Sequence, residues 1–210
     1  MKLLKKLSVI TIIFCFVTET FAEEWNVSTW GKRRAFTEHI EKLAELVSAK
    51  TNGEFTMNIS YGGLSKNREN LDGISIGAFE MAQFCAGYHP DKNRVVTVLE
   101  LPFLGVENLE QEVAVSSAVY AHPAATKEMA QWNAKLLMTS PMPQYNLVGT
   151  GAPRDTLEAF NGMRVRATGG LGKAFKAAGA VPTSVTATEA YQAMESGVVD
   201  TVAFAQHAHL

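Results

Sequence analysis

The stretch "GMRVRAT", residues 162–168, alternates apolar and polar side chains and predicts a short β-strand. Met163, Val165 and Ala167 point to one face of that strand, and two arginines and a threonine point to the other. Guanidinium groups are costly to bury unless an anion or another hydrogen-bonding partner meets them. The strand therefore raises the question of which anion or hydrogen-bonding partner its arginines bind.

The N-terminus has the pattern of a secretory signal peptide. Three lysines among the first six residues precede an apolar run from Leu7 to Val17, and small residues stand at Thr20 and Ala22. A run of roughly eleven apolar residues is too short for a helix that crosses a bilayer about 30 Å thick. We expect export, with residues 1–22 removed by cleavage after Ala22.

The composition of the mature chain excludes some classes of protein. Cleavage leaves 16 basic and 20 acidic residues, a formal charge of −4, which is not the basic excess of a nucleic-acid binder. Cys85 is then the single cysteine, so an internal disulfide cannot form. It stands in an apolar run, which favours a packed core thiol over a nucleophile.

The first part of the mature chain alternates strand and helix patterns. Apolar residues recur at helical spacing over 36–47, and strict alternation over 55–61 predicts a strand. A short helix over 68–76 leads to an apolar strand over 77–87. This order favours a mainly parallel sheet with helices on its faces.

The second part continues with a proline turn, helices and strands. The apolar stretch 95–105 closes at Pro102, and a long helical region over 108–132 should break at Pro123. "TATE" reads as a capping box that begins at Thr186. The remaining predicted elements are strands over 134–140, 162–168 and 198–204, helices over 155–160, 169–180 and 187–197, and a proline-rich crossing segment over 141–146.

Residues 160–202, "FNGMRVRATGGLGKAFKAAGAVPTSVTATEAYQAMESGVVDTV", closely resemble the signature region of the DctP-type family. These are the solute-binding proteins of tripartite ATP-independent periplasmic (TRAP) transporters. The matching elements are Gly162 followed four residues later by Arg166, then "AAGAVPTSV", "TEAYQAMESG" and "VVDTV". "LELPFLG" at 99–105 matches a further element upstream. The signal peptide and the first strand–helix–strand segments also fit, so the resemblance covers essentially all of the mature chain.

The resemblance implies an α/β, periplasmic-binding-protein-like fold of two lobes with mainly parallel sheets, which close on a small organic anion. We expect lobe I over residues 23–140 and lobe II over 141–210. The family continues well beyond the position of Leu210, so we expect the C-terminal part of both lobes to be missing. The chain is then either a fragment or a naturally truncated protein.

The resemblance also implies that Arg166 holds the carboxylate of the ligand. The chemistry agrees, because a planar guanidinium matches a carboxylate in two parallel hydrogen bonds and keeps its charge when buried. The alternative is an ion pair between Arg166 and a buried acid such as Asp200. Arg164 corresponds to an outward position in the family, and we expect it to be solvated or salt-bridged.

Side chains near the carboxyl ends of strands are candidates for the pocket wall, because ligands bind at those ends in open α/β sheets. Trp30 follows the first strand, Tyr88 follows "FCAG", and Phe204 ends the last strand. Gln144 and Tyr145 lie in the crossing segment. Each aromatic residue has the alternative of ordinary packing in the core or at the rim.

Two departures from the family bear on the ligand. Many members that bind dicarboxylates or sialic acid have a second arginine upstream, where this sequence has Gln144 and Asn146. The asparagine typical of the last element is not evident, since Thr201 and Phe204 stand there. One dominant positive contact favours a monocarboxylate with an apolar or cationic remainder against the aromatic side chains. The sequence does not exclude a sulfonate as the ligand.

The implied function is capture of a small organic acid and its delivery to a TRAP membrane permease. We expect a periplasmic monomer that needs no cofactor or metal. His207 and His209 at the end of the sequence are weak evidence for a metal site. The same pocket could instead serve a sensory system, and the sequence does not decide between transport and sensing.

An exported enzyme is the less favoured alternative. "GGLGK" lacks the spacing of a phosphate-binding loop, and the sequence contains no H-E-x-x-H. Cys85 has His89 nearby, but no framing motif of a thiol protease surrounds them. We therefore expect a binding protein without catalytic residues.

Overall fold

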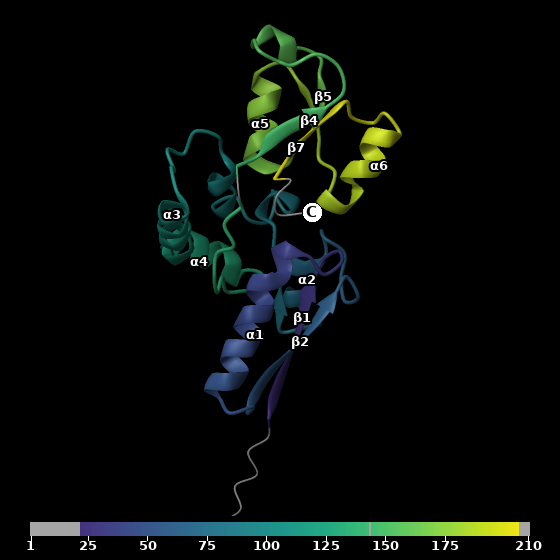
Figure 1. Ribbon diagram of the computed structural model, residues 1–210. Coiled ribbons are helices and arrows are strands. Elements are labelled where there is room, and N and C mark those ends of the chain that lie inside the picture. Colours follow the sequence, from purple (N-terminus) through teal and green to yellow (C-terminus); the bar gives the residue numbers. More distant parts are fainter. Residues whose placement is uncertain (1–21, 143, 206–210) are drawn as a thin grey trace, which may run out of the picture.

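The computed structural model describes residues 22–142 and 144–205 of the chain (Figure 1). The predicted signal peptide, apart from Ala22, and the histidines at 207 and 209 lie outside these residues. Within the described ranges, no helix is long and apolar enough to cross a membrane. Two separate β-sheets form, one from strands before residue 140 and one from strands after it.

The first sheet has strand order β2-β1-β3 and is parallel throughout. Strand β1 lies in the centre and pairs Val27 with Ile59 of β2 and with Met81 of β3. Helices connect the strands, as the alternation of strand and helix patterns predicts. The elements are β1 (Glu23–Thr29), α1 (Glu38–Lys50), β2 (Phe55–Tyr61), α2 (Asn70–Ser75) and β3 (Met81–Ala82).

Helix α1 packs its apolar stripe on this sheet. Ile40 is buried and forms a core cluster with Val27 and Met81. The helix gives way to a glycine with a positive φ of 82°, Gly53, whose N–H donates to the carbonyl of Ser48 at 2.8 Å. This left-handed residue turns the chain into β2.

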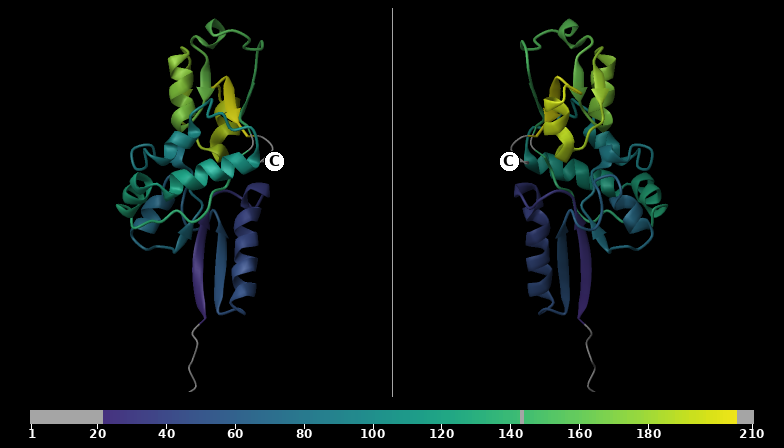
Figure 2. Two further views of the ribbon diagram at one scale, coloured as in Figure 1. Left: turned by 90° about the vertical axis from the view of Figure 1, so that its left-hand side faces the viewer. Right: turned by 90° about the vertical axis from the view of Figure 1, so that its right-hand side faces the viewer.

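Two helices, α3 (Leu109–Ala121) and α4 (Pro123–Ala130), occupy the region predicted as one helix with a break at Pro123. Asn108 caps α3 by accepting a hydrogen bond from the N–H of Gln111 at 2.9 Å. His122 is extended, and Pro123 begins α4, where its missing N–H costs no hydrogen bond. The break is confirmed. Figures 1 and 2 show both helices beside the region between the two sheets.

The second sheet has strand order β4-β7-β5-β6, and only β4 runs antiparallel to its neighbour. Strand β5 carries both arginines and pairs Val165 with Pro182 of β6 and with Thr201 of β7. The predicted mainly parallel arrangement is confirmed in both sheets. The elements are β4 (Asn146–Gly149), β5 (Arg164–Arg166), α5 (Gly169–Ala177), β6 (Val181–Thr183), α6 (Ala190–Glu195) and β7 (Thr201–Phe204).

Short 3-10 helices complete the chain between these elements. They occur where the backbone must change direction within one turn. Three of them contribute to the candidate site described below. Their ranges are Ala35–Thr37, Ala86–Tyr88, Val96–Glu100, Glu158–Phe160 and Ala187–Glu189.

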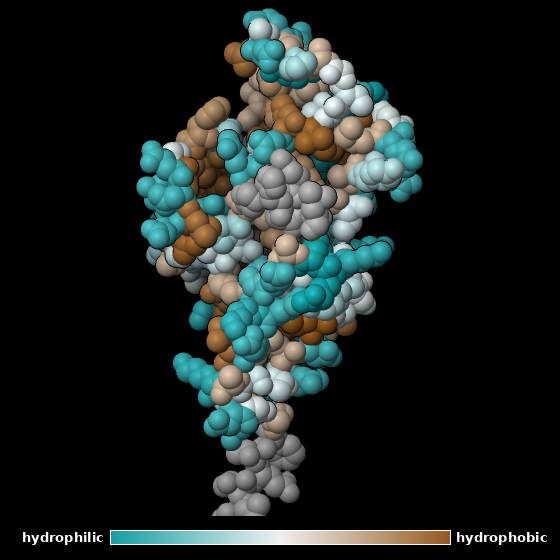
Figure 3. All heavy atoms as spheres, in the orientation of Figure 1, coloured by the Kyte–Doolittle hydropathy of each residue, from teal (hydrophilic) through white to brown (hydrophobic). Residues whose placement is uncertain are grey.

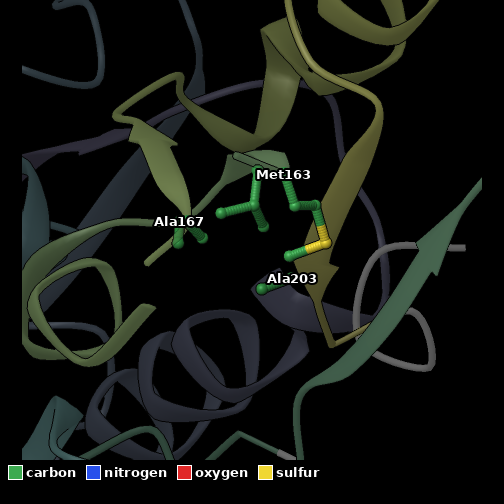
Figure 4. Close-up of a cluster of buried hydrophobic side chains, with 5 residues drawn as sticks. Met163, Ala167 and Ala203 are labelled. Atoms are coloured by element: carbon green, nitrogen blue, oxygen red, sulfur yellow. The ribbon is translucent and has the colours of Figure 1, made fainter. Parts of the chain in front are cut away.

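The apolar face of β5 forms the core of the second sheet (Figure 4). Met163, Val165 and Ala167 are buried and cluster with Ala180 and Ala203. The alternation in "GMRVRAT" is therefore confirmed as an inward apolar face. Three partly buried side chains, Phe160, Leu171 and Phe175, close the cluster.

The strand predicted over 134–140 is wrong. These residues have no regular secondary structure, and neither sheet pairs with them in the described part of the chain. A strand needs a neighbour for its N–H and C=O groups, and this apolar run has none. Leu137 is 56% exposed. The segment is a connection instead.

Two further elements are shorter than predicted. Of the strand over 77–87 only Met81–Ala82 pairs, since Gly77 has a positive φ of 70° and belongs to the turn after α2, and Ala86–Tyr88 forms a 3-10 helix. The helix over 155–160 is a single 3-10 turn, Glu158–Phe160, which begins three residues later than predicted.

Apolar side chains reach the surface near α3 and the loop before it. Phe103 is 100% exposed, and Leu101, Leu104 and Leu109 are also exposed. Figure 3 shows apolar surface on the side of the molecule where α3 lies. These side chains border the large cavity described below.

The Met163→Ala substitution is expected to lower the free energy of unfolding by about 2–5 kcal/mol, because it leaves a cavity in the cluster of Figure 4. The control is Val181→Ala on neighbouring β6, where the side chain is 52% exposed and the change should stay within about 0.5 kcal/mol. Urea unfolding measures both. Equal losses would contradict the assignment of this core.

Candidate ligand-binding site

Arg166 is the largest fully buried side chain among the described residues, at 2% exposure. Its position on β5 fixes the backbone, and three protein oxygens fix the guanidinium. Nε donates to the carbonyl of Val185 at 2.8 Å, and Nη1 donates to that of Ala203 at 3.0 Å. Nη2 donates to the hydroxyl of Tyr88 at 3.3 Å. Three of the five N–H groups of an arginine are thus held by uncharged oxygens.

The alternative ion pair between Arg166 and Asp200 does not form. Asp200 instead pairs with Arg164, whose Nε donates to Asp200 Oδ2 at 2.9 Å. Arg164 also donates to the carbonyl of Gly197 at 2.6 Å. The guanidinium of Arg164 holds the pKa of the Asp200 carboxyl below its usual value. The predicted salt-bridged surface position of Arg164 is confirmed.

Tyr88 connects Arg166 to the first sheet. Its hydroxyl accepts from Arg166 and from the N–H of Ala187 at 2.7 Å, and burial raises its pKa. Its ring meets that of Trp30 edge-on, with the ring centroids 5.8 Å apart. The ring of Phe204 lies 5.6 Å from the guanidinium carbon of Arg166. Four of the predicted site residues are therefore brought together.

Trp30 follows β1 and is buried among cationic and aromatic groups. The guanidinium carbon of Arg34 lies 4.7 Å from the indole centroid, and the ring of Phe36 lies 5.6 Å away. Arg34 Nη1 also donates to the carbonyl of Trp30 at 3.0 Å. These contacts fix the indole on the side of the first sheet that faces Tyr88.

A cavity of about 1310 Å³ lies beside this group. Of the predicted site residues it is lined by Trp30, Tyr88, Gln144 and Tyr145, whereas Arg166 and Phe204 lie behind that lining. Tyr145 as a residue is 38% exposed. Burial raises the pKa of its hydroxyl, and the charge of Arg166 and a hydrogen bond with the Arg166 side chain lower it. Gln144 is exposed. The cavity thus has aromatic walls next to one buried positive charge.

Glu100 is a site residue that sequence reasoning misses. It lines the cavity, and its Oε1 accepts from the N–H of Gly87 at 2.5 Å. Burial raises its pKa, while the amides of Gly87 and Gly170 and the Arg166 charge lower it. An acid inside the apolar stretch "VVTVLELPFLG" was the available signal, because a buried acid needs donors. Among the described residues no ion pair joins Glu100 to Arg166.

Cys85 is unsuited to nucleophilic chemistry. Burial raises the pKa of its thiol to about 12, and the negative charge of Glu100 adds to this effect. The thiol therefore stays protonated at neutral pH, and a thiolate is the reactive species. Cys85 is half-buried and lines the cavity, so its predicted place in the packed core is wrong.

Ser75 stands in "GISIG", residues 73–77, which has the G-x-S-x-G spacing of a hydrolase nucleophile elbow. In an elbow the serine occupies a sharp turn from a strand into a helix. Ser75 is instead the last residue of α2. The spacing therefore carries no catalytic geometry in this fold.

The segment 184–187, between β6 and α6, is held from several directions. Arg68 of the first half donates to the carbonyl of Ser184 at 2.6 Å and to its hydroxyl at 3.0 Å. Arg68 also donates to the carbonyl of Tyr88 at 3.2 Å. The predicted capping box at Thr186 is confirmed, since Glu189 accepts from both its N–H and its hydroxyl.

His89 supports the turn that carries Tyr88. The side chain is buried, its Nε2 lies 2.9 Å from Asn70 Oδ1, and its ring stacks on Phe84. Burial, together with the nearby Lys92 charge, lowers its pKa to about 4. The imidazole is therefore neutral in the folded protein at neutral pH.

Comparison with known proteins places these features in a family. The family model described as bacterial extracellular solute-binding protein, family 7 (DctP), matches residues 27–204. A curated relative, the outer membrane transporter protein TsaT of Comamonas testosteroni, is 22% identical over 162 residues. This alignment covers 77% of the present chain and 47% of that protein, so the chain spans about half the length of the curated relative.

Solved structures share the fold. DctP7 of Bordetella pertussis, an extracytoplasmic solute receptor binding pyroglutamic acid, superposes with a TM-score of 0.73 at 24% identity. A TRAP periplasmic solute-binding protein of Bordetella bronchiseptica with bound (R)- and (S)-mandelate gives 0.76 at 22%. Each match covers 86% of this chain and, respectively, 60% and 58% of the relative. At these identities the likeness establishes the fold, and the chain corresponds to part of each relative.

A third match is the TRAP periplasmic solute-binding protein of Desulfovibrio salexigens with bound orotic acid. It is 25% identical with a TM-score of 0.71, over 85% of this chain and 58% of that one. The predicted α/β two-lobe fold with mainly parallel sheets is confirmed by these comparisons.

The buried His89 gives a pH-dependent stability with a defined sign. Its folded pKa of about 4 lies below the value of 6.5 expected for the unfolded chain, so the unfolded state takes up the proton first as pH falls. We expect the free energy of unfolding of the wild-type chain to decrease as the pH falls from about 6.5 to about 4. In the His89→Gln variant the free energy of unfolding should decrease less steeply over the same range. Denaturant unfolding at several pH values compares the slopes. Parallel slopes would contradict the role of His89.

Proposed function

The chain belongs to family 7 of the bacterial extracellular solute-binding proteins, the DctP family of TRAP transporters, and we propose that it captures a small organic acid at Arg166. The acid is then delivered to a TRAP membrane permease, so the chain acts in transport and catalyses no reaction. The observation that carries the proposal is a buried guanidinium beside a cavity with aromatic walls.

Burial makes Arg166 selective for anions. Its protein partners are two carbonyl oxygens and the hydroxyls of Tyr88 and Tyr145, none of which neutralises the charge. A carboxylate in the cavity would supply that charge through two parallel hydrogen bonds. Closure of the lobes would exclude water, which makes the attraction stronger than at the surface, and a neutral ligand would lose it.

The aromatic walls point to the rest of the ligand. Trp30, Tyr88 and Tyr145 line the cavity and offer ring faces to an apolar or cyclic body. The solved relatives bind pyroglutamic acid, mandelate and orotic acid, each a carboxylate on a small ring-bearing molecule. We extend this class to the present chain. With Arg166 as the dominant positive contact, a monocarboxylate is the preferred ligand.

Capture by two closing lobes is the proposed mechanism. In this proposal residues 23–140 belong to lobe I and residues 141–210 to lobe II, and the chain spans only part of the length of the relatives. An open form admits the acid, closure brings Tyr88 of lobe I onto Arg166 of lobe II, and the permease recognises the closed form. The protein acts as a monomer in the periplasm, after removal of residues 1–22.

The Arg166→Ala substitution is expected to weaken binding of the acid at least about a hundredfold, or 2.7 kcal/mol. Arg166→Lys keeps the charge but loses the planar fork, and we expect a loss of at least about tenfold. Calorimetric titration with a panel of mono- and dicarboxylates measures these affinities.

The matched control is Arg164→Ala on the same strand. Its guanidinium is exposed and paired with Asp200, so we expect a change in affinity of less than about threefold. If both Arg166 variants are folded and bind the acid as tightly as the wild-type chain, the proposed role of Arg166 is wrong.

A further inference from the structure

The two arginines Arg68 and Arg166 hold one short segment from opposite sides. Arg68 Nη2 donates to the carbonyl of Ser184 at 2.6 Å, and Arg166 Nε donates to that of Val185 at 2.8 Å. These carbonyls are adjacent in the sequence, in the connection between β6 and α6. The segment 184–187 therefore takes its position from a residue before the first helix turn of α2 and from a residue of β5.

Tyr88 is a second connection between the same two arginines. Its carbonyl accepts from Arg68 Nη1 at 3.2 Å, and its hydroxyl accepts from Arg166 Nη2 at 3.3 Å. The guanidinium carbon of Arg68 also lies 5.5 Å from the centre of the Tyr88 ring. The hydroxyl further accepts from the N–H of Ala187 at 2.7 Å, which closes a ring of contacts through the segment 184–187.

Four of these hydrogen bonds join the first half of the chain to the second. Arg68 donates to the carbonyl and the hydroxyl of Ser184, and the Tyr88 hydroxyl accepts from Arg166 and from Ala187. These four bonds form only when the two parts lie together, whereas the bond from Arg68 to the Tyr88 carbonyl lies within the first half. Hydrogen bonds from a charged donor are stronger than those between neutral groups. Arg68 therefore helps to hold the two parts together although its side chain is exposed.

We infer that Arg68 is a positioning residue of the site, which holds Tyr88 and the segment 184–187 so that Arg166 keeps its orientation toward the bound acid. The inference rests on the proposed function. Arg68 touches neither Arg166 nor the cavity lining except through Tyr88, so it acts on the ligand through its neighbours. Losing it loosens the closed arrangement and shortens the lifetime of the complex.

The experiment measures association and dissociation rates of an acid that binds the wild-type chain, taken from the carboxylate panel. We expect Arg68→Ala to raise the dissociation rate about 10- to 100-fold and to change the association rate less than about threefold. The dissociation rate of Arg68→Lys should lie between those of the wild-type chain and Arg68→Ala, because the lysine ammonium can replace some but not all of the three hydrogen bonds. The control is Arg33→Ala, an arginine paired with Glu41 on α1, which should leave both rates unchanged.

A double-mutant cycle with Tyr88→Phe separates positioning from a merely structural role. This variant keeps the ring but loses the hydroxyl that bonds Arg166 and Ala187. If Arg68 acts through Tyr88, Arg68→Ala raises the dissociation rate by a clearly smaller factor in the Tyr88→Phe background than in the wild-type chain. Additive effects, or an unchanged dissociation rate in folded Arg68→Ala, would overturn the inference while leaving the proposed function intact.

The two proposals fail in different ways. A wild-type chain that binds no acid of the panel overturns the proposed function, and the role of Arg68 with it. A chain that binds an acid with rates indifferent to Arg68 overturns the role of Arg68 alone. If Arg68→Ala does not fold, the milder Arg68→Lys variant and the Ser184→Ala variant decide the question by the same rates.

Discussion

A buried arginine side chain keeps its charge and must find oxygen atoms wherever the fold places it. In this chain Arg166 finds a carbonyl from the segment after β6, a carbonyl from β7 and the hydroxyl of Tyr88. These partners come from three separate parts of the sequence. The guanidinium therefore ties strand β7 and the segment after β6 to Tyr88 of the first half of the molecule, and the rest of the site is arranged around it.

Electrostatics explains why this arrangement suits an anion. Asp200, which directly precedes β7, forms an ion pair with Arg164 at the surface and therefore does not neutralise Arg166. Glu100 lies close enough to influence the site but is itself held by the amide of Gly87. Arg166 is stabilised by dipoles rather than by a paired carboxylate, which leaves its charge available to a ligand in the neighbouring cavity.

The fold was largely predictable because its signals are local. The alternation in "GMRVRAT", the glycine after α1 and the proline at the start of α4 each act within one turn or strand. The strand predicted over 134–140 failed because pairing depends on a distant neighbour. The same limit applies to the site. Arg166 could be named from the family resemblance, and Tyr88 and Trp30 from strand ends, but Glu100 and Arg68 gain their roles through contacts with other elements.

The most direct test of the account is a crystal structure of the chain with a bound small organic acid. The account predicts that the carboxylate meets the guanidinium of Arg166, with the body of the ligand against Trp30, Tyr88 and Tyr145 in the large cavity. A carboxylate bound at another place, while Arg166 faces only protein oxygens, would contradict it.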